Sequence, residues 1–269
     1  MNIALIGFGR MGKMIEAAAR ERGHRIAAVV DPYGPDGAAP GTALYKTIEE
    51  AEPLGGADLA VEFTRPETAA ENIKALAKRG IPAVTGTTGW YGRLEEVKQA
   101  VEASGSSLLW SSNFSLGVHF FYRIAAFAAA LADAVPEYDA GGWEAHHNKK
   151  ADSPSGTARI LAEKVLARMK RKTRAVFETL NRPPAAEEFH YPSLRIGSAP
   201  GIHTLIFDSP ADTIEITHTA RNREGFALGA VRAAEWLVSC SGPGKPAGAR
   251  RRGIFTMDDV LAGLWPDQP

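Results

Sequence analysis

The densest run of side chains able to do chemistry lies between residues 144 and 157, which read EAHHNKKADSPSGT. Histidine titrates near neutral pH, so His146 and His147 are candidate proton donors. Neighbours on a strand point to opposite faces, and the two rings therefore cannot both face a core. Lys150 adds a cation that would attract a carboxylate. Taken alone, the stretch is more typical of a solvated loop whose Ser and Asp side chains cap a helix.

A second anion-binding feature follows at Ser155-Gly156-Thr157, where a helix predicted over Ala158–Lys170 opens. The free N–H groups of a helix start attract anions. A His/Lys loop that leads into such a start, in a chain that also carries a dinucleotide-binding pattern, favours an active site for an anionic substrate. We predict no metal, because the chain has one cysteine and no H-E-x-x-H spacing.

A glycine-rich loop joins the first predicted strand to the first helix: Gly7-Phe8-Gly9-Arg10-Met11-Gly12. In this G-x-G-x-x-G pattern the first glycine permits a tight turn, the second lets the backbone approach a pyrophosphate, and the third allows close helix packing. Asp31 ends the second strand about twenty residues on, where an acid accepts hydrogen bonds from a ribose. The spacing to Asp31 favours a dinucleotide site over a plain strand–turn–helix.

Two further polar segments follow predicted strands at the edge where open α/β sheets bind ligands. They are Gly86-Thr87-Thr88-Gly89 and Ser111-Ser112-Asn113-Phe114-Ser115. Their small residues and hydroxyls suit a nicotinamide or ribose, but turns with capping hydroxyls have the same composition.

Short apolar runs alternate with helical patterns over about the first 110 residues, which predicts a parallel doubly wound sheet. The predicted strands are Ile3–Ile6, Ile26–Val30, Leu59–Phe63, Ile81–Val84 and Ser107–Trp110, and the helices are Met11–Arg22, Glu67–Arg79 and Arg93–Ala103. After Ser115 we predict helices over Phe120–Leu131, Phe226–Val238 and Met257–Leu264, with strands over Trp143–His146, Thr204–Phe207 and Thr213–Thr219. Residues 239–252 are expected to form a loop.

Composition limits the partners of the chain. Its 31 basic and 31 acidic residues balance, so no global field recruits nucleic acid or a membrane. The N-terminus lacks the features of a signal peptide, and no apolar run reaches the roughly 18 residues of a membrane helix, so we expect a cytoplasmic protein. Cys240 sits in an apolar stretch and is interpreted as a packing residue.

These residues resemble the 4-hydroxy-tetrahydrodipicolinate reductase (dihydrodipicolinate reductase) family of bacterial lysine and diaminopimelate synthesis. Residues 144–158 look like its signature E-x-H-H-x-x-K-x-D-x-P-S-G-T-A. Weaker matches span nearly the whole chain: Glu62-Phe63-Thr64 with Pro66, Gly86–Gly89, Asn113–Val118, and His218–Arg223 leading into Phe226–Ala230.

The resemblance implies a role for each matched residue. His146 would be the acid/base residue with Lys150 as its partner, and the substrate carboxylates would bind His147, Ser155, Gly156 and Thr157. The cofactor would bind Gly7–Gly12, Gly86–Thr88 and Ser111–Phe114, and the spacing described above adds Asp31 to this site. The implied architecture is α/β: a Rossmann-type domain over 1–117 completed by 224–269, and an α+β substrate and oligomerisation domain with a mixed sheet over 118–223, usually in a homotetramer.

The chain departs from the family pattern at three places. The glycine loop is one residue shorter than usual, His119 stands where the family often has Asn, and Gly197–His203 lacks two acids that most members carry. The loss of the two acids affects the residues that support the substrate-binding side chains near Gly197–His203 and the subunit assembly at that segment. The roles of His203 and His218 stay open.

The expected reaction is NAD(P)H-dependent reduction of 4-hydroxy-tetrahydrodipicolinate, a small cyclic dicarboxylate, to tetrahydrodipicolinate. An amino-acid dehydrogenase acting on aspartate, homoserine or diaminopimelate would share the first domain, and a dinucleotide-sensing regulator would need a basic DNA-binding element. Asp31 would repel the 2′-phosphate of NADPH, so we expect a preference for NADH, with Arg10 and Lys13 as cations able to admit NADPH.

Overall fold

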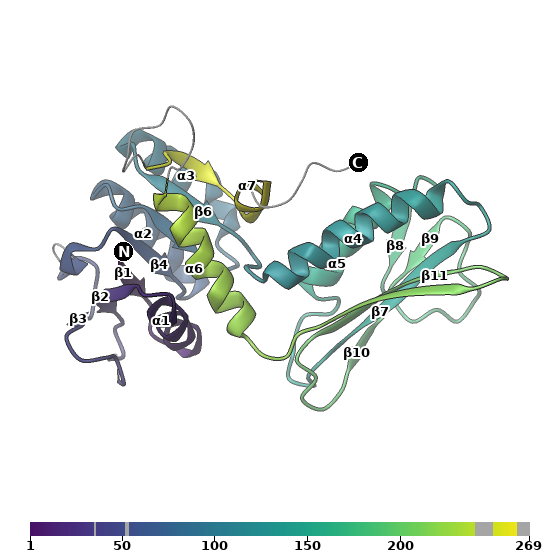
Figure 1. Cartoon of the computed structure of the whole chain (residues 1–269), viewed down its shortest axis with the longest axis horizontal. Helices are drawn as coiled ribbons and strands as arrows, with labels where there is room; N and C mark the ends of the chain where they lie inside the picture. The colour runs from purple at the N-terminus through teal and green to yellow at the C-terminus, as the bar shows by residue number, and fades with distance from the viewer. Residues whose placement is uncertain (35, 52–53, 240–249, 263–269) are drawn as a thin grey trace. The chain divides into compact units, whose positions relative to one another are not determined.

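The computed structural model describes residues 1–34, 36–51, 54–239 and 250–262. The chain forms two compact units (Figure 1): one comprises Met1–Phe114 and the chain from Arg223 on, and the other comprises Ser115–Asn222. Cys240 and the end of the predicted last helix lie outside the described residues. The predicted α/β class, with one Rossmann-type parallel sheet and one mixed sheet, is confirmed.

The first unit is built on a seven-stranded sheet in the order β13-β6-β5-β4-β1-β2-β3, and every neighbouring pair is parallel. Its strands are β1 (Asn2–Ile6), β2 (Arg25–Val30), β3 (Ala43–Tyr45), β4 (Leu59–Glu62), β5 (Ala83–Thr85), β6 (Ser107–Trp110) and β13 (Gly253–Phe255). The sequence analysis missed β3 and β13, which lie at the two edges of the sheet.

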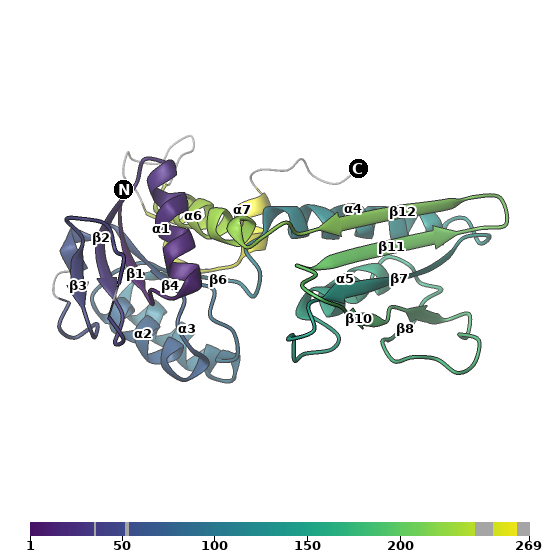
Figure 2. The same ribbon diagram turned by 90° about the horizontal axis from the view of Figure 1, so that it is seen from below.

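Helices cover both faces of this sheet, as a parallel sheet with apolar strands requires. They are α1 (Arg10–Glu21), α2 (Pro66–Lys78), α3 (Leu94–Ser104), α6 (Glu224–Val238) and α7 (Met257–Ala262), with short 3-10 turns at Leu54–Gly56 and Tyr91–Arg93. Figure 2 shows α1 and α6 on one side of the sheet and α2 and α3 on the other. Helix α6 lies so close to the end of β6 that a Cβ at Gly229 would overlap the carbonyl oxygen of Phe114.

The second unit is a six-stranded mixed sheet with two helices on one face (Figures 1 and 2). Its elements are α4 (Leu116–Asp133), β7 (Asp139–His146), α5 (Gly156–Leu166), β8 (Arg174–Val176), β9 (Glu188–His190), β10 (Ser193–Arg195), β11 (Ile202–Asp208) and β12 (Thr213–Thr219). The sheet runs β12-β11-β7-β9-β8, and β10 pairs with β7. The buried rings of Phe189, Tyr191 and Phe207 pack with α4 and α5 into the core of this unit.

Helix α4 corrects one prediction. It has 18 residues and a mean hydropathy of 1.3, so by length and composition alone it is apolar enough to cross a membrane. Its buried residues, among them Phe121, Ala125 and Ala129, pack in the same core as α5. One face of α4 therefore belongs to the core of the second unit, while Phe120, Phe127 and Leu131 on the same helix are exposed.

Candidate active site

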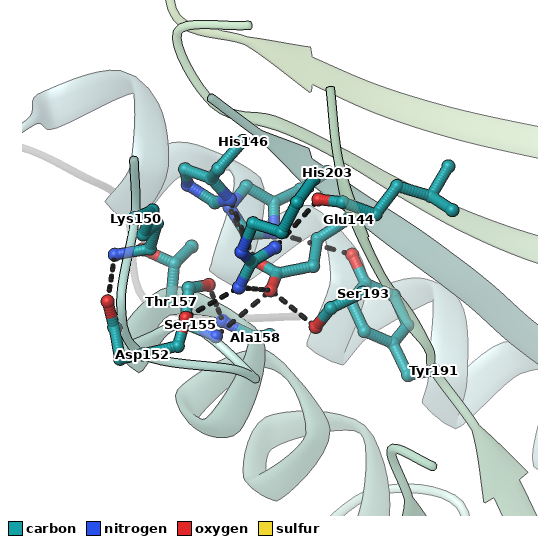
Figure 3. A network of polar contacts seen from close by, with 12 residues as sticks. Glu144, His146, Lys150, Asp152, Ser155, Thr157, Ala158, Tyr191, Ser193 and His203 are labelled. Atoms are coloured by element: carbon teal, nitrogen blue, oxygen red, sulfur yellow. Dashed lines mark hydrogen bonds and ion pairs between the residues drawn. The ribbon is translucent and has the colours of Figure 1, made fainter. Parts of the chain in front are cut away.

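The carboxylate of Glu144 organises the polar residues at the end of β7. Glu144 is fully buried, and its Oε1 accepts hydrogen bonds from the Ser155 N–H at 3.0 Å, the Ser193 hydroxyl at 2.6 Å and the Arg195 guanidinium at 3.2 Å. Its other oxygen, Oε2, lies 3.1 Å from Nδ1 of His146. Figure 3 shows Glu144, His146, Ser155 and Ser193 close together, from β7, the loop before α5 and β10.

Glu144 stays ionised although it is buried, because these donors stabilise its carboxylate. Burial alone would raise the pKa of Glu144, but the contacts with His146, Ser155 and Ser193 outweigh it and hold the pKa well below its usual range. A carboxylate facing Nδ1 keeps the proton on that nitrogen and fixes the orientation of the ring. The opposite ring nitrogen, Nε2, is then the one able to exchange a proton with a substrate.

Lys150 lies in the loop that follows β7, and its ammonium is 2.7 Å from the carboxylate of Asp152. Arg195 ties the same loop to β10, since its guanidinium donates to the carbonyl oxygen of Asp152 at 2.6 Å as well as to Glu144. The loop that carries Lys150 is thus anchored to the residue that holds His146. This places the predicted pair, His146 and Lys150, in one network (Figure 3).

The predicted carboxylate-binding residues lie around the start of α5. The Ser155 hydroxyl accepts from the Ala158 N–H at 3.1 Å and so caps the helix, while Gly156 and Thr157 form its first turn. First-turn N–H groups and the positive end of the helix dipole suit an anion. His147 is half-buried, and within the described part of the chain no hydrogen bond or ion pair joins it to Glu144.

His203 is a residue of this cluster whose role the sequence left open. It lies on β11 opposite Glu144 on β7, and its ring centre is 5.3 Å from that of His146. Burial lowers the pKa of His203 to about 3, so the ring is neutral at physiological pH. Sequence reasoning could not pair His203 with Glu144, because the β7–β11 register joins them.

Neutral His203 is expected to make the fold sensitive to acid. Because the folded pKa is depressed below the ordinary 6.5, the stabilisation is present above pH 6.5 and is lost as pH falls toward 3. Inside that window, the free energy of unfolding falls by up to about 1.4 kcal/mol for each pH unit. We expect His203→Gln to lose stability less steeply than the wild type between about pH 6.5 and about pH 5 in urea unfolding. Parallel stability curves for the two proteins would contradict this role.

Glu144, His146 and His203 also form the one group of potential metal ligands found among the described residues, with ligand atoms within 4.8 Å of one another. Sequence spacing gave no sign of this group. Three hydrogen-bond donors already engage Glu144. We therefore interpret the group as an acid–base cluster, and the absence of a metal stays a prediction.

The glycine loop lies in the first unit, between β1 and α1. Gly7 has φ +91°, and a Cβ there would overlap the carbonyl oxygen of Phe63, so this turn requires glycine. Gly9 precedes α1, and no side chain caps the helix start. A Cβ at Gly9 would meet nothing within 4 Å, which leaves room for a pyrophosphate beside the free helix N–H groups.

Two cavities open at this edge of the sheet. The first, which we name the glycine-loop cavity, has a volume of about 350 Å³ and is lined by Gly9, Arg10, Met11, Phe63, Thr64, Pro66, Gly86, Thr87, Thr88 and Arg223. The second, named the Asp31 cavity, has a volume of about 460 Å³ and includes Gly7, Gly9 and Asp31 in its lining. The predicted Ser111–Phe114 segment lines neither cavity, and the Phe114 side chain is buried.

Glu62, for which no function was predicted, is hydrogen-bonded to two threonines that line the glycine-loop cavity. Its buried carboxyl group accepts hydrogen bonds from the hydroxyls of Thr64, Thr85 and Thr87. Burial raises the pKa of Glu62, against the lowering effect of these donors. The Thr64 N–H also donates to the Thr87 hydroxyl oxygen at 2.8 Å, so the loops after β4 and β5 are fixed to each other.

Asp31 is held at the rim of its cavity by two backbone groups. The Phe8 N–H donates to Oδ2 at 2.7 Å, and the Tyr33 N–H donates to Oδ1 at 2.9 Å. The carboxylate therefore joins the glycine loop to the end of β2, where a ribose can reach its remaining lone pairs. A parallel sheet with these features, in a chain that also carries an acid–base cluster, defines a nicotinamide-dependent oxidoreductase.

Comparison with known protein families shows which family of oxidoreductases this chain belongs to. The N-terminal model of dihydrodipicolinate reductase matches residues 1–114, and the C-terminal model matches residues 117–261. A 4-hydroxy-tetrahydrodipicolinate reductase from Christiangramia forsetii is 36% identical over 98% of this chain and 99% of its own length. One from Archaeoglobus fulgidus is 35% identical over 97% of this chain and 100% of its own length. The chain belongs to the dihydrodipicolinate reductase family.

A solved structure of dipicolinate-bound dihydrodipicolinate reductase from Paenisporosarcina sp. TG-14 has the same fold, with a TM-score of 0.70 and 20% identity over 87% of this chain and 93% of that one. An amine dehydrogenase from Mycobacterium smegmatis is less similar, with a TM-score of 0.61 and 13% identity over 96% of this chain and 95% of that one. The full-length matches favour the reductase over the dehydrogenase and regulator alternatives. The predicted NAD(P)H-dependent reductase activity and its place in lysine and diaminopimelate synthesis are confirmed.

Proposed function

We propose that His146 is the general acid in the reduction of 4-hydroxy-tetrahydrodipicolinate and that Lys150 assists it. When bound, the reduced nicotinamide supplies the hydride. The 4-hydroxyl group of the substrate leaves as water together with a hydrogen from the neighbouring ring carbon, which gives a conjugated imine. Addition of hydride to that imine leaves negative charge on the substrate, which protonation by His146 removes. The contact that supports this assignment is that of Glu144 Oε2 with Nδ1 of His146 at 3.1 Å, which orients the ring and leaves Nε2 to face a substrate.

The proposed substrate-binding residues act on the two carboxylates. The first turn of α5, with Gly156 and Thr157, receives one carboxylate at the positive end of the helix dipole, and Lys150 and His147 supply further charge and hydrogen bonds. These contacts hold the ring in the geometry for hydride transfer. This assigns substrate binding to the second unit and cofactor binding to the first.

A coupled assay tests the proposed function. Pyruvate, aspartate semialdehyde and the upstream synthase generate the substrate, and the loss of absorbance of the reduced nicotinamide measures turnover. Oxidation of the cofactor that depends on all three additions supports the assignment. No oxidation with either NADH or NADPH refutes it.

Pyridine-2,6-dicarboxylate, a planar mimic that carries both carboxylates, is expected to inhibit competitively. Thr157→Val should weaken this inhibition by on the order of 1–3 kcal/mol, because a charged partner loses a hydrogen bond. Inhibition constants for the wild type and the variant measure the effect. A value unchanged by the substitution removes Thr157 from the site.

Two finer properties belong to this proposal. We expect NADH to be preferred, because the carboxylate of Asp31 accepts from both ribose hydroxyls and repels a 2′-phosphate. We also expect a cytoplasmic homotetramer that associates through the second unit, where Leu194, Ile196 and Ile214 expose apolar side chains on or beside sheet strands. Sedimentation of the purified protein measures the assembly.

A further inference from the structure

The Asp31 cavity contains cations that no sequence motif marks. Lys46 and Arg65 line it together with Tyr33, Glu49 and Asp31. The residues directly after Asp31, Pro32 and Tyr33, supply no positive charge. The basic side chains therefore reach this cavity from other strands and helices of the first unit.

Lys46 is brought beside Asp31 by strand pairing. β2 and β3 run parallel with Val30 opposite Tyr45, and the Asp31 N–H donates to the carbonyl oxygen of Tyr45 at 3.0 Å. Lys46 is the next residue after Tyr45, so it leaves the sheet at the same edge as Asp31. Its side chain is exposed, and no ion pair is found for its ammonium group within the described residues.

Arg65 comes from a third element, since it is the N-cap residue of α2. The centre of its guanidinium group lies 5.1 Å from the centroid of the Tyr33 ring, at the distance of a cation–π contact. The Tyr33 N–H in turn donates to Asp31. Tyr33 thus links Arg65 to the Asp31 carboxylate.

The two cations named from the sequence do not reach this cavity. Arg10 lines the glycine-loop cavity, and the Lys13 ammonium lies 5.8 Å from the centroid of the Phe8 ring. Neither residue is part of the lining of the Asp31 cavity. Any 2′-phosphate beside Asp31 therefore meets Lys46 and Arg65 rather than Arg10 and Lys13.

We propose that Lys46 and Arg65 bind the 2′-phosphate of NADPH, so that the enzyme uses NADPH as well as its preferred NADH. This inference rests on the proposed nicotinamide-dependent function. Asp31 and Glu49 oppose a phosphate in this cavity, and the two cations offset their charge. Arginine can bind a phosphate through two parallel hydrogen bonds, while lysine contributes a compact point charge.

Binding of cofactor fragments tests the proposal without turnover. Titration calorimetry compares 2′,5′-ADP, which carries the 2′-phosphate, with 5′-AMP, which lacks it. Lys46→Ala and Arg65→Ala should each weaken the binding of 2′,5′-ADP by about tenfold or more, as expected for the loss of a charge-assisted contact. The affinity of each variant for 5′-AMP should change by less than about twofold. Lys98→Ala is the matched control, because Lys98 pairs with Glu95 on α3 outside the cavity and its loss removes the same charge.

Unchanged affinity for 2′,5′-ADP in both variants would overturn the proposal. An equal loss for both fragments would also overturn it, because the side chains would then bind the adenosine and not the phosphate. With the full cofactors, the ratio of kcat/KM for NADPH to that for NADH should fall in Lys46→Ala. Intact fragment binding together with a failed coupled assay would refute the substrate assignment and leave the 2′-phosphate site standing.

Discussion

Replacing His146 by glutamine is expected to lower kcat by roughly 10²- to 10⁴-fold, the usual effect of losing a general acid. Glutamine keeps a polar side chain of similar reach, but it has no proton to give at neutral pH. Lys150→Met should lower kcat by about 10²-fold or more, since it removes the cation that assists the transfer. Steady-state kinetics in the coupled assay give kcat and KM for each variant, and circular dichroism checks that each is folded.

His147→Gln is the matched control for this prediction. His147 is the neighbouring histidine, and we assign it to substrate binding, so its replacement should raise KM more than it lowers kcat. Near-normal turnover in His146→Gln with abolished turnover in His147→Gln would show that the two roles are exchanged. Normal turnover in all three variants would place the proton donor elsewhere.

The parts of the fold that were predictable are those encoded locally. Long apolar runs such as Ile26–Val30 and the helical period of Glu67–Arg79 identify β2 and α2 to within a few residues. The strands β3, β8, β9, β10 and β13 have three residues each, too few to show an alternation. Their pairing is decided by partners elsewhere in the sheet, for example β7 for β10.

Helix α4 was predicted too short, although Ser115, whose hydroxyl accepts from the Val118 N–H, is a capping signal that the sequence shows.

The same division applies to the sites. The motif around His146 contains Glu144, yet the function of that carboxylate depends on Ser193 and Arg195, which only the β7–β10 pairing brings near it. The spacing from the glycine loop to Asp31 follows a local rule of βαβ units. The cation beside Asp31 follows no such rule, because Lys46 arrives through the β2–β3 register.

Composition alone does not decide the role of the Ser111–Phe114 segment. Small polar residues after a strand fit a ligand-binding loop, but here the Ser111 hydroxyl donates to the carbonyl oxygen of Asn113 at 2.7 Å and accepts from its N–H at 3.1 Å. The Phe114 ring lies 5.9 Å from that of Phe63 and is buried. Local hydrogen bonds therefore engage the Ser111 hydroxyl, and the role of the segment in cofactor binding stays a prediction.

Glu144→Gln is expected to lower kcat by about 10²- to 10⁴-fold, comparable to the loss when the acid that orients a catalytic histidine becomes an amide. Oε1 of Glu144 faces three donors, so the amide oxygen of glutamine will occupy that position. Its NH₂ group then faces Nδ1 of His146, where the carboxylate oxygen Oε2 lay at 3.1 Å. A donor there forces Nδ1 to accept, which selects the other neutral tautomer of His146 and moves the proton to Nε2.

Glu188→Gln is the matched control, because Glu188 is another buried carboxylate of the same sheet, on β9, paired with Arg174 and Arg182. If Glu144 only supported the fold, both variants would lose stability while kcat changed little. We expect instead that Glu188→Gln retains kcat and that Glu144→Gln loses it even at temperatures where the protein is fully folded. Nitrogen-15 NMR of the histidine rings provides a second measurement, since the two neutral tautomers have different shifts. Proton retention on Nδ1 of His146 in Glu144→Gln, together with normal kcat, would show that the carboxylate does not set the state of the acid.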